Sequence, residues 1–173
     1  NGSYYALARG CSDELIKSLG LTTWKCPEER APSKRFRERY RDHADFWKNR
    51  LVVPLRTPRG ALMGVEVRSL PPSKKFVSCY LLPRSKWNPM WLCERDAHRR
   101  VWNGAHIWIV EGVFDLAPLV SVLPRNHVVM ATRRAYLSKY NLAYLQRFAQ
   151  GRVHLAYDND DTGKKKMDFY MPV

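Results

Sequence analysis

Carboxylates follow two short apolar runs of this chain. Glu111 comes directly after residues 107–110, and Asp158 and Asp160 follow residues 153–157. Short apolar runs of this kind are typical of buried strands. Strands that end side by side in an open α/β sheet present their last residues to one crevice, so the three carboxylates would meet there. Their oxygens suit Mg²⁺, which proteins hold through one or two carboxylates together with substrate phosphates.

The acidic segment 158–163 also has a structural interpretation. Its sequence, Asp-Asn-Asp-Asp-Thr-Gly, is typical of a polar turn between a strand and a helix. Taken singly, each acidic motif could be structural. Their pairing, each after a predicted strand, favours a metal site for phosphoryl chemistry.

The chain is strongly basic. Its 173 residues include 30 Lys and Arg against 16 Asp and Glu, a net charge of +14. Most of the excess lies in residues 1–100, where 21 basic residues stand against 10 acids. Such a balance indicates a polyanionic partner, because Lys and Arg replace the counterions that condense on phosphates. Together with the acidic motifs, it indicates nucleic acid and metal.

Other features of the sequence argue against a membrane protein, a secreted protein and a zinc protein. No apolar run approaches the length of about 18 residues that indicates a membrane span, and the first residues lack a signal-peptide pattern. We therefore expect a cytoplasmic protein with no membrane partner. No C-x-x-C pair occurs, so we expect no zinc in this chain. The histidines are scattered without ligand spacing, and we assign them no metal role.

Two lobes are predicted, a basic α+β lobe over residues 1–100 and an α/β lobe over residues 101–173. In the first, helices are expected within 4–20, where Ser12 caps the second helix and Gly20 ends it. A β-hairpin and a third strand are expected after them. The three predicted strands cover residues 51–56, 61–68 and 76–82.

The second lobe alternates strand-like and helix-like runs. Alternation of this kind predicts a parallel sheet flanked by helices, which makes the fold class α/β. The expected strands are 107–110, 127–131 and 153–157, and the expected helices lie near 113–122 and 137–149. Arg99, Arg100 and the Asn-Gly pair at 103–104 mark the expected junction between the lobes.

The paired acidic motifs resemble those of the TOPRIM domain, a metal-binding α/β module shared by bacterial-type primases, type IA and type II topoisomerases and some nucleases. Its glutamate motif matches Glu111-Gly112 with Asp115, and its Asp-x-Asp motif matches Asp158-Asn159-Asp160. The whole chain most resembles the RNA-polymerase core of bacterial-type and phage (DnaG-like) DNA primases without their zinc-binding domain. Residues 5–21 are similar to that family's opening helical hairpin, and residues 50–68 to its basic β-hairpin.

This resemblance implies synthesis of short RNA primers on single-stranded DNA by nucleotidyl transfer that depends on Mg²⁺ or Mn²⁺. Asp158 and Asp160 would hold the metal of the triphosphate, and Glu111 would be a ligand or a general base near the attacking hydroxyl. Asp161 would be a further candidate metal ligand or would support the others. Asp115 would also support them, although it could equally cap its own helix. The implied partners are single-stranded DNA and ribonucleoside triphosphates, with a replicative helicase as a further candidate.

A groove that follows the phosphate backbone is expected among basic residues of the first lobe. Each of them could instead be an ordinary exposed charge. The candidates are Arg50, Arg56, Arg68, Lys75 and Lys86. Trp87 and Trp91 could stack on bases, although tryptophans at such positions more often anchor a core.

Three features depart from the primase pattern. A third acidic pair downstream of Asp-x-Asp is missing, which leaves open an incomplete metal site and a TOPRIM domain shortened at its C-terminal end. No part of this sequence resembles the family's zinc module, so we expect any choice of start site to reside elsewhere. Arg133 and Arg134 stand where a small Gly-Thr turn is expected. Two alternatives therefore stay open, a TOPRIM-type nuclease and a nucleic-acid-binding module with a degenerate metal site.

Overall fold

A computed structural model describes residues 6–7, 9–23, 50–57, 60–68, 76–80 and 91–170. The chain packs as two compact units. The first comprises residues 1–55 and 62–86, and the second comprises 56–61 and 87–173. The division into 1–100 and 101–173 stays a prediction about domains. The compact units divide the chain at residue 87 and assign residues 56–61 to the second unit.

Helix α2 (Asp13–Leu19) of the first unit begins and ends where the sequence predicts. The hydroxyl of Ser12 accepts the backbone N–H of Leu15 at 3.1 Å, which satisfies one of the free donors of the first turn. Gly20 closes the helix with φ 69°, a left-handed conformation that suits glycine. Both ends of the helix therefore carry the capping contacts that the sequence predicts.

The first unit also contains a four-stranded sheet. Its order is β1-β2-β3-β4, with β1 (Thr22–Thr23) antiparallel to β2 (Leu51–Arg56) and β4 (Phe76–Tyr80) antiparallel to β3 (Leu62–Arg68). The predicted hairpin is confirmed, because the N–H of Gly60 bonds the Thr57 carbonyl at 2.8 Å between β2 and β3. Strand β1 was not predicted, since two residues are too few to show an alternating pattern.

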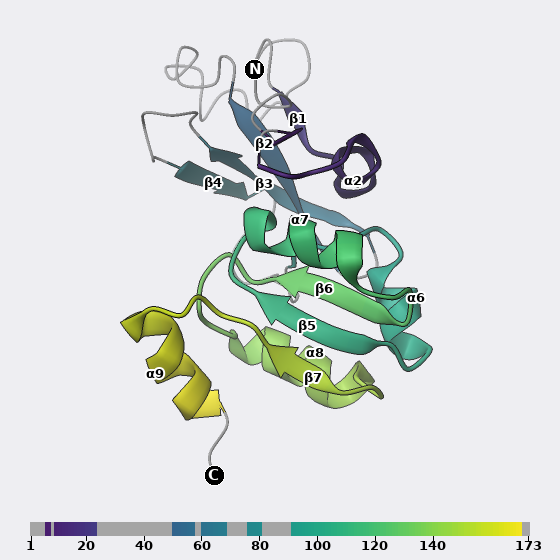
Figure 1. Cartoon of the computed structure of the whole chain (residues 1–173), viewed down its shortest axis with the longest axis vertical. Coiled ribbons are helices and arrows are strands. Elements are labelled where there is room, and N and C mark those ends of the chain that lie inside the picture. Colours follow the sequence, from purple (N-terminus) through teal and green to yellow (C-terminus); the bar gives the residue numbers. More distant parts are fainter. Residues whose placement is uncertain are drawn as a thin grey trace. The chain divides into compact units, whose positions relative to one another are not determined.

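A three-stranded parallel sheet forms the centre of the second unit. Strand β5 (His106–Val110) lies between β6 (His127–Ala131) and β7 (Val153–Leu155). Helix α7 (Val113–Val122) covers one face and α8 (Lys139–Phe148) the other, and α9 (Asp161–Tyr170) follows β7 (Figure 1). The predicted α/β class is confirmed. Helix α8 starts two residues later than predicted because the Ser138 hydroxyl caps it through the N–H of Asn141.

The core of the second unit follows the alternation of its strands. Ile107 and Ile109 of β5 are fully buried and belong to one cluster with Met130 of β6 and Tyr144 of α8. Val110, of the opposite parity, points to the other face of the sheet and is also buried. Burying a side chain of this size contributes about 1.5–3 kcal/mol, so this cluster holds the sheet and α8 together.

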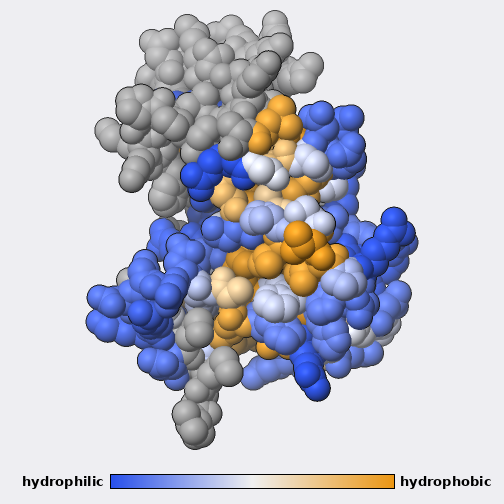
Figure 2. Space-filling model, viewed as in Figure 1, coloured by the Kyte–Doolittle hydropathy of each residue, from blue (hydrophilic) through white to orange (hydrophobic). Residues whose placement is uncertain are grey.

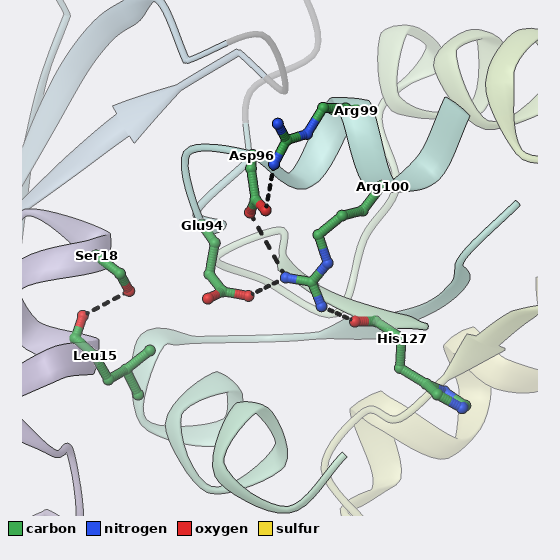
Figure 3. Close-up of polar contacts among 7 residues, drawn as sticks. All are labelled: Leu15, Ser18, Glu94, Asp96, Arg99, Arg100 and His127. Atoms are coloured by element: carbon green, nitrogen blue, oxygen red, sulfur yellow. Dashed lines mark hydrogen bonds and ion pairs between the residues drawn. The ribbon is translucent and has the colours of Figure 1, made fainter. Parts of the chain in front are cut away.

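The segment expected to join the lobes instead forms α6 (Ala97–Trp102). Its Arg100 bonds the carboxylate of Glu94 at 2.6 Å, lies 3.6 Å from Asp96 and donates to the carbonyl of His127 (Figure 3). Leu92 also forms a reciprocal pair of backbone hydrogen bonds with Ala131, at 3.0 and 2.8 Å. These contacts tie residues 92–100 to strand β6, which explains why this segment packs with the second unit.

Three histidines that are far apart in the sequence gather on one face of the sheet. The parallel register sets His106 beside His127 and Trp108 beside His154. The indole of Trp108 stacks on His154, with ring centroids 4.4 Å apart, and donates to Nδ1 of His127 at 2.9 Å. The histidines therefore form a packed aromatic cluster that sequence spacing did not predict.

The surface of the described residues is mostly hydrophilic in the view of Figure 2, with apolar side chains visible where α7 crosses it. Val122, near the end of that helix, is 74% exposed. In the described part of the chain, no helix has the length and apolar character that crossing a membrane requires.

Candidate functional site

The carboxyl ends of the three parallel strands meet at one edge of the second unit. Just beyond β7, the N–H of Ala156 donates to the carbonyl of Ile109 at 2.8 Å. Just beyond β6, the N–H of Thr132 donates to the carbonyl of Val110 at 3.0 Å. Glu111, the turn after β6 and the acidic loop after β7 therefore start from the same edge of the sheet (Figure 1).

Glu111 and Asp158 are in direct contact. A carboxylate oxygen of Glu111, Oε1, accepts the backbone N–H of Asp158 at 3.2 Å, although 47 positions separate them. The two acidic motifs thus lie together, as the sequence suggested. Asp158 takes part in this contact through its backbone, and the residue is exposed.

Asp160 organises the start of α9. Its Oδ1 accepts the N–H of Gly163 at 2.7 Å, and its carbonyl accepts the N–H of Lys164 at 3.0 Å. These bonds are typical of a helix N-terminus. The acidic segment therefore does form a polar turn between a strand and a helix, which was the structural interpretation of its sequence. Asp160 and Asp161 are both exposed. The same loop can therefore cap a helix and present carboxylates.

Gly163 packs against the backbone of Asp158. A Cβ atom at this position would lie 1.9 Å from the Asp158 carbonyl oxygen, far inside any van der Waals contact. Only glycine permits the first turn of α9 to approach Asp158 so closely. In the sequence, Gly163 stood out only as the residue that follows the acidic motif, and its close approach to Asp158 was not predicted.

Asp115 caps helix α7. Its Oδ2 accepts the N–H of Gly112 at 2.8 Å, from the N3 position of the helix. A carboxylate there also interacts favourably with the positive end of the helix dipole. Asp115 thereby holds the backbone directly after Glu111, which is the capping alternative considered from the sequence.

The site is electrostatically strained by its own acids. Burial raises the pKa of Glu111, and the negative charges of Asp158, Asp160 and Asp115 raise it further, while the N–H of Asp158 lowers it in part. A divalent cation would relieve this repulsion, and an all-oxygen donor set suits a hard cation. The residues therefore fit Mg²⁺ or Mn²⁺.

The described residues do not form a complete metal cage. No group of three His, Cys, Asp or Glu among them stands close enough to hold an ion by itself. This agrees with the usual binding of Mg²⁺, which combines one or two carboxylates with water and substrate phosphate. A cation here would need water or a bound phosphate group for part of its coordination.

We expect Glu111→Gln to raise the free energy of unfolding of the metal-free protein at neutral pH. A raised pKa of Glu111 means that the folded state binds its proton more tightly than the unfolded state. Wild-type stability therefore falls as pH rises from about 4.3, the ordinary glutamate pKa, through the folded-state pKa of Glu111. Glutamine does not ionise, so its advantage should appear above this window and vanish below about pH 4.

Urea unfolding at pH 4 and pH 7.5 measures this difference. Asp168→Asn is the matched control, because Asp168 is an exposed acid on α9 outside the cluster. A Glu111→Gln variant no more stable than wild type at pH 7.5 would contradict the expectation.

Two of the predicted groove residues have roles within the fold. Arg68 pairs through Nε with the carboxylate of Glu66 at 2.5 Å, and Glu66 is only 2% exposed, so Arg68 neutralises a buried acid. Arg56 donates to the Gly60 carbonyl at 3.0 Å, and burial followed by the charge of Arg95 lowers its pKa. Contact with phosphate stays a prediction for both.

The structure describes only some of the remaining basic and aromatic candidates. Arg50 is half-buried and directly precedes β2. Lys75, Lys86 and Trp87 lie outside the described residues. Trp91 is completely buried and its ring lies edge-on to Tyr144, with centroids 6.2 Å apart. The suggestion that Trp91 could stack on bases is therefore wrong, because its ring is part of the core.

The chain is similar to known proteins in both sequence and fold. Residues 108–171 match the Toprim-like family. A DNA primase of Aquifex aeolicus is 28% identical over 133 residues, which cover 76% of this chain and 26% of the primase. The chain thus spans about a quarter of the length of that curated relative.

Two solved structures illustrate the likeness in fold. The RNA polymerase domain of the Mycobacterium tuberculosis primase DnaG has a TM-score of 0.70 at 19% identity, over 98% of this chain and 63% of that one. A DnaG primase catalytic domain bound to single-stranded DNA has a TM-score of 0.69 at 18% identity, over 97% and 57% of the two chains. The resemblance to DnaG-like primases predicted from the sequence is confirmed.

Proposed function

We propose, from the premise that this chain has a Toprim-like domain within the fold of a DnaG-like primase core, that it synthesises RNA primers on single-stranded DNA. The observation that carries the proposal is the contact between the Glu111 carboxylate and the Asp158 backbone at the carboxyl edge of the sheet. It unites the two acidic motifs in one site, and the Toprim-like match covers both of them.

The acidic residues have distinct roles in the proposed reaction. Asp158 and Asp160, supported by Asp161, would hold Mg²⁺ or Mn²⁺, which supplies charge neutralisation for the triphosphate when bound. Glu111 orients the Asp158 loop and accepts the proton of the attacking 3′ hydroxyl. Its raised pKa suits a general base, because proton transfer is most effective when the pKa lies nearer the operating pH.

The substrates follow from charge and similarity. The net charge of +14 favours a nucleic acid, and one similar primase domain is bound to single-stranded DNA. Basic residues of the N-terminal lobe would follow the template backbone, and ribonucleoside triphosphates would enter at the acids. The proposed template-binding residues are Arg50, Arg56, Arg68, Lys75 and Lys86. A helicase partner, the absence of zinc and a cytoplasmic location also stay predictions.

A Toprim-type nuclease is not favoured, because the relatives described above are primases. A nucleic-acid-binding module with a degenerate metal site is the remaining rival. Its acids would bind no metal, and the chain would catalyse no nucleotidyl transfer.

A primer-synthesis assay separates these functions. The chain is incubated with single-stranded DNA and labelled ribonucleoside triphosphates, with Mg²⁺, with Mn²⁺ or with a chelator, and a parallel reaction follows end-labelled DNA. We expect short labelled RNA in the metal-containing reactions only, with intact DNA. Cleaved DNA without labelled RNA would identify a nuclease, and neither product would favour the binding module.

A further inference from the structure

Arg133 adopts a backbone conformation that disfavours side chains. Its φ is 73°, and it is the one non-glycine residue with positive φ in the part of the chain that the structure describes. The other such positions there, for example Gly60 and Gly104, are glycines. A residue with a Cβ atom is disfavoured in this region, and long or branched residues adopt it only when the surrounding structure imposes it.

The turn that contains Arg133 lies at the edge of the acidic site. The preceding residue, Thr132, donates its N–H to the carbonyl of Val110 at 3.0 Å, and Val110 directly precedes Glu111. The hydroxyl of Thr132 also lies 3.3 Å from that carbonyl and bonds the carbonyl of Arg134. These contacts fix the turn against the end of β5, so the backbone of Arg133 is held near that of Glu111.

The negative charge at this edge of the sheet favours a role for Arg133 in binding an anion. The loops at this edge carry four acids that are exposed or half-buried, namely Glu111, Asp158, Asp160 and Asp161. A triphosphate carries several negative charges, and such a crevice would repel it unless cations offset the acids. Arg133 is half-buried, and a guanidinium presents a rigid fork of donors that matches phosphate oxygens.

We propose that Arg133 binds phosphate oxygens of the incoming nucleoside triphosphate, and that its left-handed backbone is retained to present the guanidinium at the acidic edge. Strained residues of this kind concentrate at functional sites, where the strain supports positioning. The proposal rests on the proposed function, since it assigns a residue to the nucleotide of that reaction. Glycine would satisfy the turn better and would remove the phosphate contact.

Calorimetric binding of inorganic triphosphate in the presence of Mg²⁺ tests this assignment on the full chain. We expect Arg133→Gly to bind at least tenfold more weakly than wild type, while it melts at the same or a higher temperature because glycine accepts positive φ. Arg133→Lys should recover part of the affinity. Arg134→Gly is the matched control, since it removes the neighbouring exposed charge, and should bind within threefold of wild type.

The proposal is overturned if Arg133→Gly binds triphosphate within threefold of wild type, or if Arg134→Gly loses as much affinity, which would indicate only a general charge effect. Primer synthesis is measured separately on the same proteins. Primer synthesis by wild type together with unchanged triphosphate binding by Arg133→Gly refutes the assignment alone. Weakened triphosphate binding by that variant without primer synthesis by wild type refutes the proposed function alone.

Discussion

Asp158→Ala should abolish primer synthesis, by a factor of about 1,000 or more, without unfolding the protein. Loss of a metal-binding carboxylate removes several kcal/mol of transition-state stabilisation, and each 1.4 kcal/mol is about tenfold in rate. The fold should survive because Asp158 contacts Glu111 through its backbone N–H, which alanine retains. Removing one acid from the cluster also relieves repulsion on Glu111, so the melting temperature should equal or exceed that of wild type.

Asp168→Ala is the matched control for this variant. It makes the same change in charge at an exposed position of α9 and should synthesise primers normally. Titration with Mn²⁺ and a nucleoside triphosphate should show weaker metal binding for Asp158→Ala alone. If folded Asp158→Ala keeps more than about a tenth of the wild-type rate, Asp158 is not a metal ligand. A tenfold loss is about a hundredfold smaller than the expected loss.

Gly163→Ala should inactivate the site indirectly. The added Cβ would lie 1.9 Å from the carbonyl oxygen of Asp158, so either the loop or the first turn of α9 must move. We expect a loss of primer synthesis of about 100-fold or more, because small displacements of catalytic groups are that costly. We also expect a lower free energy of unfolding, by about 1–3 kcal/mol, the usual cost of overpacking.

The sign of the change in the free energy of unfolding distinguishes the steric clash from helix propensity. Alanine is a better helix former than glycine by about 1 kcal/mol, so without the clash Gly163→Ala would stabilise α9. Lys164→Ala, in the same turn and exposed, is the control and should leave stability and activity near wild type. Urea unfolding and the primer assay measure both quantities. A more stable and fully active Gly163→Ala variant would show that Asp158 does not depend on this contact.

Local patterns predicted most of the second unit and helix α2 of the first unit. The apolar runs that became β5, β6 and β7 were recognised because buried parallel strands are nearly continuous in apolar residues. Helix α2 was delimited by Ser12 and Gly20, whose capping chemistry acts within a few residues. Helix α6 was missed, because its short run of basic residues resembled a linker and its reason to pack lies in the distant contact of Arg100 with His127.

The candidate site divides in the same way. The sequence by itself determined that Glu111, Asp158 and Asp160 follow predicted strands, since that information is local. Only the tertiary structure decided that Glu111 bonds the backbone of Asp158, that Gly163 lies against it and that Trp91 is buried. Strand order and register, which bring together residues more than 40 positions apart, arise from packing of the whole sheet and leave no mark in short sequence windows.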